Sequence, residues 1–173
     1  MIVLFRSIVL LSCFFLASCV SKETNYKISQ GDVFGTYYRL QIDSDNDFSK
    51  QIDSVFTAID KAANSYVDHS EISSFNKTGI LKKPSPTFLK MLTQAKNYYK
   101  TSNGYFSPSL YPIIKYWKED FKNKSQIDST TVDSLLKLTS FNNVAFNTNE
   151  VRALKKGVKI DFSAMGEGYA LDA

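Results

Sequence analysis

The chain has 173 residues, of which 43% are hydrophobic and 22% are charged, a composition typical of a single globular domain and too short for two sizeable cores. Its formal net charge is +4, but the lysines are scattered among acidic residues, so the basic stripe of a nucleic-acid-binding protein is not indicated. Both cysteines, Cys13 and Cys19, lie near the start, which excludes a disulfide framework and a thiolate metal site from the rest of the chain.

The first residues have the layout of an export signal. Arg6 precedes an apolar run over residues 7–17 that is too short for a transmembrane helix, and small residues follow it. The letters "LASC", ending at Cys19, resemble the lipobox of bacterial lipoproteins. This resemblance implies that residues 1–18 are removed and that Cys19 is lipidated. The protein is then exported and anchored to a bacterial cell membrane, on the periplasmic side. An ordinary signal peptide with incidental cysteines is the alternative.

The next segments predict a tether, a strand and a helix. Residues 19–30 are polar and indicate a tether between the anchor and the fold. Alternating side chains predict a strand over residues 36–42, and apolar residues at helical spacing predict an amphipathic helix from Phe48 to near Ser65. Residues 64–79, rich in Asn, Ser and Asp, indicate a loop with at most one helical turn.

A second long helix has clear start and stop signals. Ser85 can cap it, Pro86 suits its first position, and Asn103 and Gly104 end it. A short helix or turn over residues 107–117 follows.

The last third of the chain predicts a helix, a hairpin and a final helix. Thr130 and Asp133 have the spacing of a capping box at the start of a helix. Residues 142–162 predict a hairpin whose second half enters the closing segment through residues 159–162, and a helix is expected to begin near Gly166.

Catalytic side chains are sparse in this chain. His69 lies in a polar loop, where an exposed, solvated histidine is the default interpretation. Four segments rich in glycine, serine, aromatic and acidic residues stand out, each beside a regular element, where binding residues tend to lie. They are "GDVFGTYY", "SYVDHSEISSFN", "SNGYFSP" and "DFSAMGEGYALD".

In this order, the four segments resemble the ApbE family of bacterial flavin transferases. "FGT" is similar to the family's Met-Gly-Thr turn, and "SYVDHSEISSFN" to its Ser-Glu segment ending in asparagine. "SNGYFSPSLYPIIKYW" is similar to the Asp-Gly-Ala-Phe-Asp-Pro segment, and "DFSAMGEGYALD" to the glutamate variant of its Asp-x-x-x-x-x-[Lys or Glu]-Gly-Tyr-x-x-Asp motif. The resemblance covers residues 31–173.

The resemblance implies an α/β (α+β) domain with a mixed sheet and packed helices. It also implies a magnesium-dependent FAD:protein FMN transferase, which cleaves FAD and esterifies FMN onto a threonine of an acceptor protein in membrane redox complexes. An FAD pyrophosphatase that releases FMN and AMP, a non-catalytic FAD-binding lipoprotein and a purely structural lipoprotein are the alternatives.

Family members are longer than this chain, and the closing motif lies near the middle of their domain. We therefore expect this chain to be an amino-terminal half. We expect the family's His-x-x-Asp-Pro and Ala-Asp-Ala-x-x-Thr segments, and the catalytic residues, to lie beyond residue 173. The isolated chain is then expected to be inactive, to bind magnesium weakly and to aggregate.

Several residues are candidates for the flavin site. Phe34 and Tyr66 offer flat apolar faces for a flavin or adenine ring, and core packing is the alternative for each. The turn at residues 166–168 is expected to present helix-start amide donors to a pyrophosphate. The remaining candidates follow from the resemblance: Tyr105, Phe106 and Ser107 beside the ligand, Asp161 and Glu167 on its polar edges, and the Ala164 carbonyl as one magnesium ligand.

Both acids have structural alternatives. Asp161 is also placed to cap a helix, and Glu167 to interact with the helix dipole in a first turn. Two positions depart from the family pattern. Phe34 replaces the usual methionine and keeps an apolar contact, whereas Ser107 replaces an aspartate and removes a charge.

Overall fold

The computed structural model describes residues 26–121 and 128–173. The predicted signal peptide and the lipidation site at Cys19 lie outside these residues. The chain divides into two compact units, one formed by residues 1–32 and 37–47 and the other by residues 33–36 and 48–173. Among the described residues, no helix combines the length and the apolar character needed to cross a bilayer.

The strands β1 (Lys27–Val33) and β2 (Thr36–Ile42) form a two-stranded sheet that belongs to the first unit except for the turn at residues 33–36. The second strand has the predicted bounds. The first strand corrects the prediction of a tether over residues 19–30, because β1 begins within that segment. Half-buried and exposed side chains alternate along most of both strands, as expected for a sheet with one covered face.

The second unit begins with three helices, α2 (Ser49–Ala63), α3 (Glu71–Thr78) and α4 (Pro86–Thr101). The caps of α4 confirm the prediction, since the Ser85 hydroxyl accepts from the Phe88 N–H at 3.1 Å and Pro86 follows. Helix α3 lies where a loop was expected. The Ser70 hydroxyl caps it by accepting from the Ser73 N–H, and Gly79 ends it at a φ of 74°.

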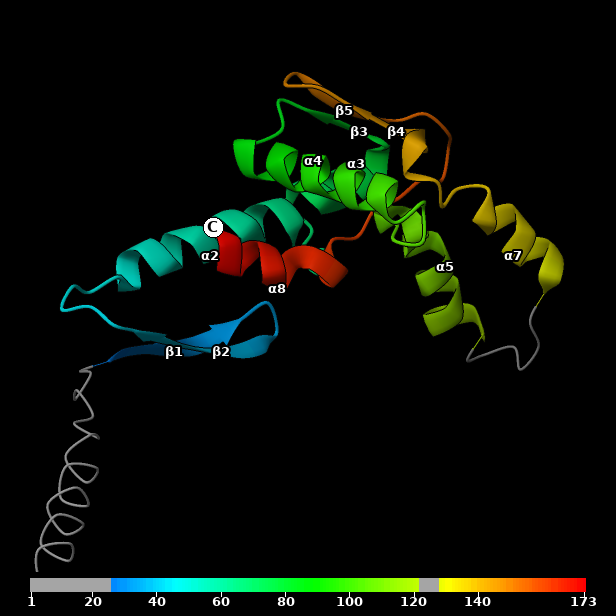
Figure 1. The fold of residues 1–173 in the computed structure, drawn as a ribbon. Helices are drawn as coiled ribbons and strands as arrows, with labels where there is room; N and C mark the ends of the chain where they lie inside the picture. Colours follow the sequence, from blue (N-terminus) through cyan, green and yellow to red (C-terminus); the bar gives the residue numbers. More distant parts are fainter. Residues whose placement is uncertain (1–25, 122–127) are drawn as a thin grey trace, which may run out of the picture. The chain divides into compact units, whose positions relative to one another are not determined.

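A short antiparallel sheet lies beside these helices (Figure 1). Its strands are β3 (Ile80–Lys82), β5 (Glu150–Ala153) and β4 (Val144–Phe146), in that order. Leu81 and Phe146 both pair with Val151 of the central strand. The predicted hairpin is therefore confirmed as β4 and β5, but it ends at Ala153.

Shorter elements fill the segment between α4 and the hairpin. They are η1 (Pro108–Leu110), α5 (Tyr111–Lys115), η2 (Tyr116–Phe121), α7 (Ser129–Leu136) and η3 (Phe141–Asn143). The predicted capping box at Thr130 is corrected, because Asp128 caps α7 and accepts from the Thr130 N–H at 3.0 Å.

The closing segment differs from its prediction. Residues 158–162 form no strand, and α8 (Ser163–Asp172) begins three residues before Gly166. Helix α8 contacts α2 and lies beside it in Figure 1. The core joins side chains from α2, α3, α4, the small sheet and α8: Ile59, Ala62, Ile72, Phe75, Phe88, Met91, Leu92, Ala95, Phe141, Val144, Val151, Val158, Ile160, Phe162, Met165 and Tyr169.

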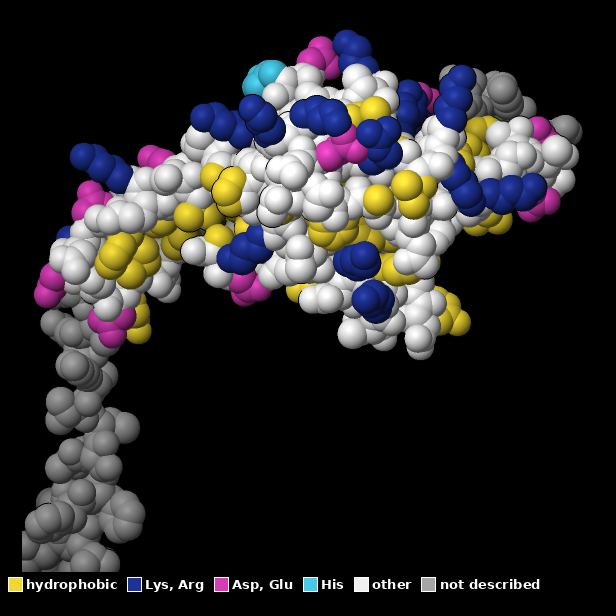
Figure 2. Space-filling view, turned by 90° about the horizontal axis from the view of Figure 1, so that it is seen from above, with side chains coloured by type: hydrophobic (Ala, Val, Ile, Leu, Met, Phe, Trp, Pro, Cys, Tyr) yellow, Lys and Arg dark blue, Asp and Glu magenta, His cyan; other side chains and the backbone are white. Residues whose placement is uncertain are grey.

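Charged side chains are dispersed over the face of the molecule that Figure 2 shows. Lysine and arginine side chains lie among acidic ones there, with apolar patches between them. Positive and negative side chains are therefore interspersed on this face, as they are along the sequence.

Candidate functional site

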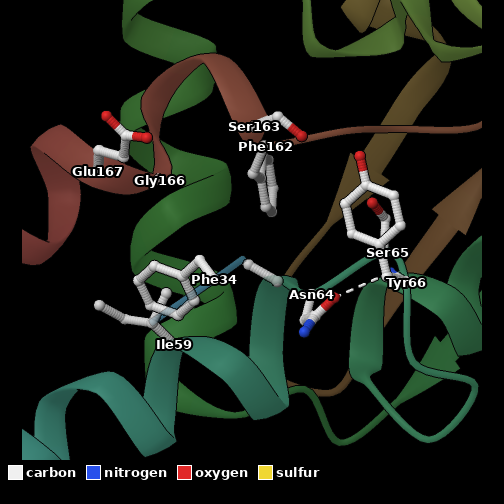
Figure 3. A pocket seen from close by; sticks show the side chains of 10 residues that line it. Phe34, Ile59, Asn64, Ser65, Tyr66, Phe162, Ser163, Gly166 and Glu167 are labelled. Atoms are coloured by element: carbon white, nitrogen blue, oxygen red, sulfur yellow. Dashed lines mark hydrogen bonds between the residues drawn. The ribbon is translucent and has the colours of Figure 1, made fainter. Parts of the chain in front are cut away.

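A cavity of about 180 Å³ opens between the end of α2 and the start of α8. Its walls come from the 33–36 turn, from α2 and the loop that follows it, and from the first turns of α8 (Figure 3). Three predicted site residues, Phe34, Tyr66 and Glu167, line it together. The other lining residues are Ile59, Ala63, Asn64, Ser65, Phe162, Ser163 and Gly166.

Phe34 reaches this cavity from a strained turn. Phe34 and Gly35 join β1 to β2 with φ angles of 53° and 77°. A two-residue hairpin loop with positive φ at both central positions has the type I′ pattern, which favours Asn and Gly. The Phe34 ring is half-buried and meets the ring of Phe56 edge-on, with 5.9 Å between the ring centroids. Phe34 therefore contacts the edge of the core and also forms part of the cavity wall.

Tyr66 lies in a loop that Asn64 fixes. The Asn64 amide donates to Asp60 Oδ1 at 2.7 Å, and its Oδ1 accepts from the Tyr66 N–H at 2.8 Å, as the dashed line in Figure 3 marks. The Tyr66 side chain is 85% exposed. Core packing is thus excluded for Tyr66, whose ring offers a free face at the cavity. The sequence did not predict this role of Asn64, because an asparagine two residues before a tyrosine also occurs in ordinary turns.

The start of α8 forms the opposite wall. Phe162 is 1% exposed and its ring lies 5.7 Å from that of Phe88. The prediction of free amide donors at residues 166–168 is wrong for Gly166, because both glycines lie inside the helix and the Gly166 N–H donates to the Phe162 carbonyl at 2.8 Å. A Cβ atom at Gly166 would meet no atom within 4 Å. Packing therefore does not require this glycine, and the backbone there is open to the cavity.

The two acids take different positions. Asp161 Oδ1 accepts from the Ser163 N–H at 2.9 Å and from the Ser163 hydroxyl at 2.6 Å. Asp161 thus makes the helix-start contact that was its structural alternative, and it does not line the cavity. Glu167 is exposed and lies beyond the first turn of α8, so its dipole alternative is wrong. Its side chain borders the cavity.

A second cavity, of about 290 Å³, borders other residues of α8. Phe106 and Ala164 line it, and Phe106 meets Tyr98 edge-on at 5.9 Å between centroids. Burial raises the pKa of Tyr169, which also lines it. The remaining lining residues are Gln94, Tyr98, Met165, Gly168 and Asp172.

Besides Asp161, two of the predicted flavin contacts lie outside both cavities. Tyr105 is 93% exposed and lines neither of them. Ser107 is buried, and its hydroxyl donates to the Thr139 carbonyl at 2.5 Å and accepts from the Ser109 N–H at 3.2 Å. The Ser107 side chain therefore joins the start of η1 to the backbone of Thr139. His69 is exposed, as predicted.

The described residues do not form a magnesium site by themselves. Ala164 lies in the first turn of α8 and offers one neutral carbonyl, whereas magnesium takes six oxygen ligands in an octahedron. No group of three His, Cys, Asp or Glu residues converges in the described ranges.

Comparison with solved structures identifies the class of fold. The apo form of the flavinyl transferase ApbE from Pseudomonas stutzeri aligns with a TM-score of 0.75 at 14% identity, over 89% of this chain and 55% of that one. A mutant of the flavin transferase ApbE from Vibrio cholerae aligns with a TM-score of 0.74 at 16% identity, over 86% of this chain and 54% of that one. The chain thus has the α+β fold of these proteins, and the predicted fold class is confirmed.

Sequence comparison identifies the family. A protein of Chlamydia pneumoniae named FAD:protein FMN transferase is 27% identical over 172 residues, covering 94% of this chain and 54% of that protein. One of the same name from Chlamydia trachomatis is 28% identical over 177 residues, covering 95% and 55%. This chain spans about half the length of these curated relatives. The ApbE family model matches residues 34–173, and the chain belongs to the ApbE family.

Proposed function

We propose that this chain supplies part of the flavin-nucleotide site of an FAD:protein FMN transferase. The observation that carries the proposal is the cavity at α8, which Phe34, Tyr66 and Glu167 line together. Two aromatic faces and one carboxylate suit a flat ring with polar edges. The names of the curated relatives and of the solved structures support the same assignment.

The cavity is the right size for part of the substrate. Sites for ligands of drug size enclose about 300–1,000 Å³, while this one encloses about 180 Å³. It therefore suits the isoalloxazine or the adenine ring of FAD, with the remainder of the dinucleotide outside it. Tyr66 stacks on the ring, Phe34 closes the edge of the site, and Glu167 accepts hydrogen bonds from ring N–H or ribose hydroxyl groups.

In the proposed reaction, a threonine hydroxyl of the acceptor protein attacks the phosphorus on the FMN side of the pyrophosphate. A phosphate ester forms to the threonine, the P–O bond to AMP breaks, and the hydroxyl proton leaves with AMP or solvent. The described residues bind and orient the flavin, and no catalytic residue is assigned among them. Magnesium dependence, with the Ala164 carbonyl as one ligand, is part of the proposal. The described donors do not complete a metal site, and further ligands would have to come from outside the described residues.

The test is a transfer assay with product analysis by mass. The chain is incubated with FAD, a threonine-containing acceptor domain, and either magnesium or a chelator. The proposed reaction predicts an acceptor heavier by one FMN ester, with AMP released, for a protein of the relatives' length that contains this chain, and no transfer by the isolated chain. FMN and AMP without a modified acceptor indicate the pyrophosphatase, and unchanged FAD with measurable binding indicates the FAD-binding lipoprotein.

We also propose that the protein is exported and anchored to a bacterial membrane through lipid on Cys19. The support is the sequence pattern alone. Metabolic labelling with a fatty-acid analogue should mark the wild type and the Cys13→Ala control but not Cys19→Ala. Label that persists in Cys19→Ala contradicts the anchor.

A further inference from the structure

A side chain from α3 holds the backbone just before the candidate site. Asn76 Nδ2 donates to the Ile160 carbonyl at 2.8 Å, and Asn76 Oδ1 accepts from the Ile160 N–H at 2.8 Å. The two residues are 84 positions apart in sequence. Asn76 thus bonds both backbone polar groups of Ile160, as a neighbouring strand would, in a segment that forms no strand.

The backbone of the next residue, Asp161, makes a further hydrogen bond. The Asp161 N–H donates to the Pro108 carbonyl at 2.8 Å, and Ile160 itself is fully buried. The backbone is therefore fixed at two consecutive residues immediately before Phe162 and Ser163. Those two line the cavity and begin α8, so the position of this wall depends on the Asn76 and Pro108 contacts.

The chemistry at residue 76 is specific to a carboxamide. A carboxylate of the same shape keeps the acceptor for the Ile160 N–H but has no hydrogen to donate to the Ile160 carbonyl. It also places negative charge beside that carbonyl oxygen. Asn76 is half-buried and lines neither cavity at α8, so a direct contact with a ligand in them is not its role.

We propose that Asn76 is a positioning residue for the flavin site: by holding Ile160, it sets the start of α8 and hence the cavity wall at Phe162, Ser163 and Gly166. The effect on ligand binding rests on the proposed function. The backbone contact itself is testable without any ligand.

The first experiment measures amide hydrogen exchange in the full chain without ligand. Asn76→Ala loses both bonds to Ile160 and should increase exchange at residues 160–163 at least about tenfold, because this segment then opens locally. Asn76→Asp keeps the acceptor for the Ile160 N–H and loses only the bond to the carbonyl, so it should increase exchange there by a smaller factor. Asn97→Ala, the same change at an exposed helical asparagine, should leave exchange at these residues unchanged. Unchanged exchange at residues 160–163 in both Asn76 variants overturns the proposal.

The second experiment separates positioning from general stability. Val144→Ala opens the core in β4 away from the Asn76 contact and serves as a destabilised control. FAD is titrated by flavin fluorescence at a temperature where all variants are folded. Asn76→Asp should raise the Kd at least about fivefold, and Val144→Ala less than about twofold.

Equal losses in the two variants overturn the positioning role and make Asn76 a residue of general stability. A wild-type chain that binds no FAD contradicts the proposed function instead. In that case the exchange measurement still decides whether Asn76 positions the start of α8.

Discussion

At the scale of single residues, Phe34 is the clearest conflict between local preference and structure. A phenylalanine with a φ of 53° occupies a region that costs a residue with a Cβ about 1–2 kcal/mol. Glycine would form the same turn without this cost, and asparagine at a lower cost. The ring contacts Phe56 and borders the cavity, so the strained backbone places an aromatic face at the candidate site, as strain at functional sites commonly does.

Phe34→Asn should therefore separate stability from binding. Relief of about 1–2 kcal/mol of backbone strain offsets the loss of an aromatic pair worth about 0.5–1.5 kcal/mol. We expect the free energy of unfolding in urea to change by less than about 1.5 kcal/mol and the Kd for FAD to rise at least about fivefold. A loss of more than about 3 kcal/mol in stability would instead identify Phe34 as a core residue.

Asp161 combines a structural contact with a predicted ligand contact. Its Oδ1 accepts two hydrogen bonds from Ser163, and an asparagine keeps this acceptor while removing the charge. If the charged carboxylate also holds the flavin, Asp161→Asn should raise the Kd for FAD at least about tenfold, the loss of a charged hydrogen bond of about 1.5–3 kcal/mol.

The paired variant Asp161→Ala should lose the same affinity and, in addition, about 1 kcal/mol of unfolding free energy from the helix start. Titration and urea unfolding of both variants check this. Wild-type affinity in Asp161→Asn would mean that the acid only supports the start of α8.

At the scale of elements, α3 connects segments that are distant in sequence. Glu71 in its first turn accepts from the Ser85 N–H at 2.6 Å and from the Ser85 hydroxyl, while Ser85 itself caps α4. Asn76 in its last turn holds Ile160. The family-like segment at residues 65–76 therefore joins α4 and the closing segment, and its Ser70, Glu71 and Asn76 side chains line neither cavity at α8.

Glu71→Gln should destabilise the fold without a change at the cavity. Two hydrogen bonds to a charged acceptor are weakened, so we expect a loss of about 1.5–3 kcal/mol in the free energy of urea unfolding. Glu119→Gln removes an exposed carboxylate whose ion pair with Lys115 is 3.6 Å long, and should change stability by less than about 1 kcal/mol. Equal effects of the two substitutions would show that the Glu71 contact contributes little.

Elements with strong local signals could be predicted from the sequence. The alternation in residues 36–42 and the Ser85–Pro86 start of α4 gave bounds that the structure confirms. Helix α3 was missed because its serines and asparagine are typical of turns, while the buried Ile72 and Phe75 that stabilise it depend on tertiary packing. The strand predicted at residues 159–162 does not form. The Asn76 side chain bonds the Ile160 backbone there instead, and no local pattern signals this contact. Likewise, the position of Ser107 against Thr139 depends on residues distant in sequence.

At the scale of the whole molecule, α8 is the element on which the proposed site depends. It borders a cavity with Phe34, Tyr66 and Glu167 and a second cavity with Phe106 and Ala164. Five of the predicted site residues thus line one or the other cavity, and Tyr105, Ser107 and Asp161 line neither. Aromatic side chains and a carboxylate line both cavities, and the first is distinguished by the 85% exposed Tyr66. The chain spans about half of its curated relatives, so the transfer reaction and the binding of a ring remain proposals, whereas the cavity itself is formed by described residues.

The most direct test of this account is a titration of FAD into the wild type, Tyr66→Ala and Tyr105→Ala, with flavin fluorescence as the measure of binding. The two tyrosines are a matched pair, 85% and 93% exposed, and only Tyr66 borders the cavity. Because stacking on an aromatic ring contributes about 1–3 kcal/mol, we predict that Tyr66→Ala raises the Kd at least about tenfold. Tyr105→Ala should change it less than about twofold. Wild-type affinity in Tyr66→Ala, or an equal loss in both variants, would contradict the placement of the flavin in this cavity.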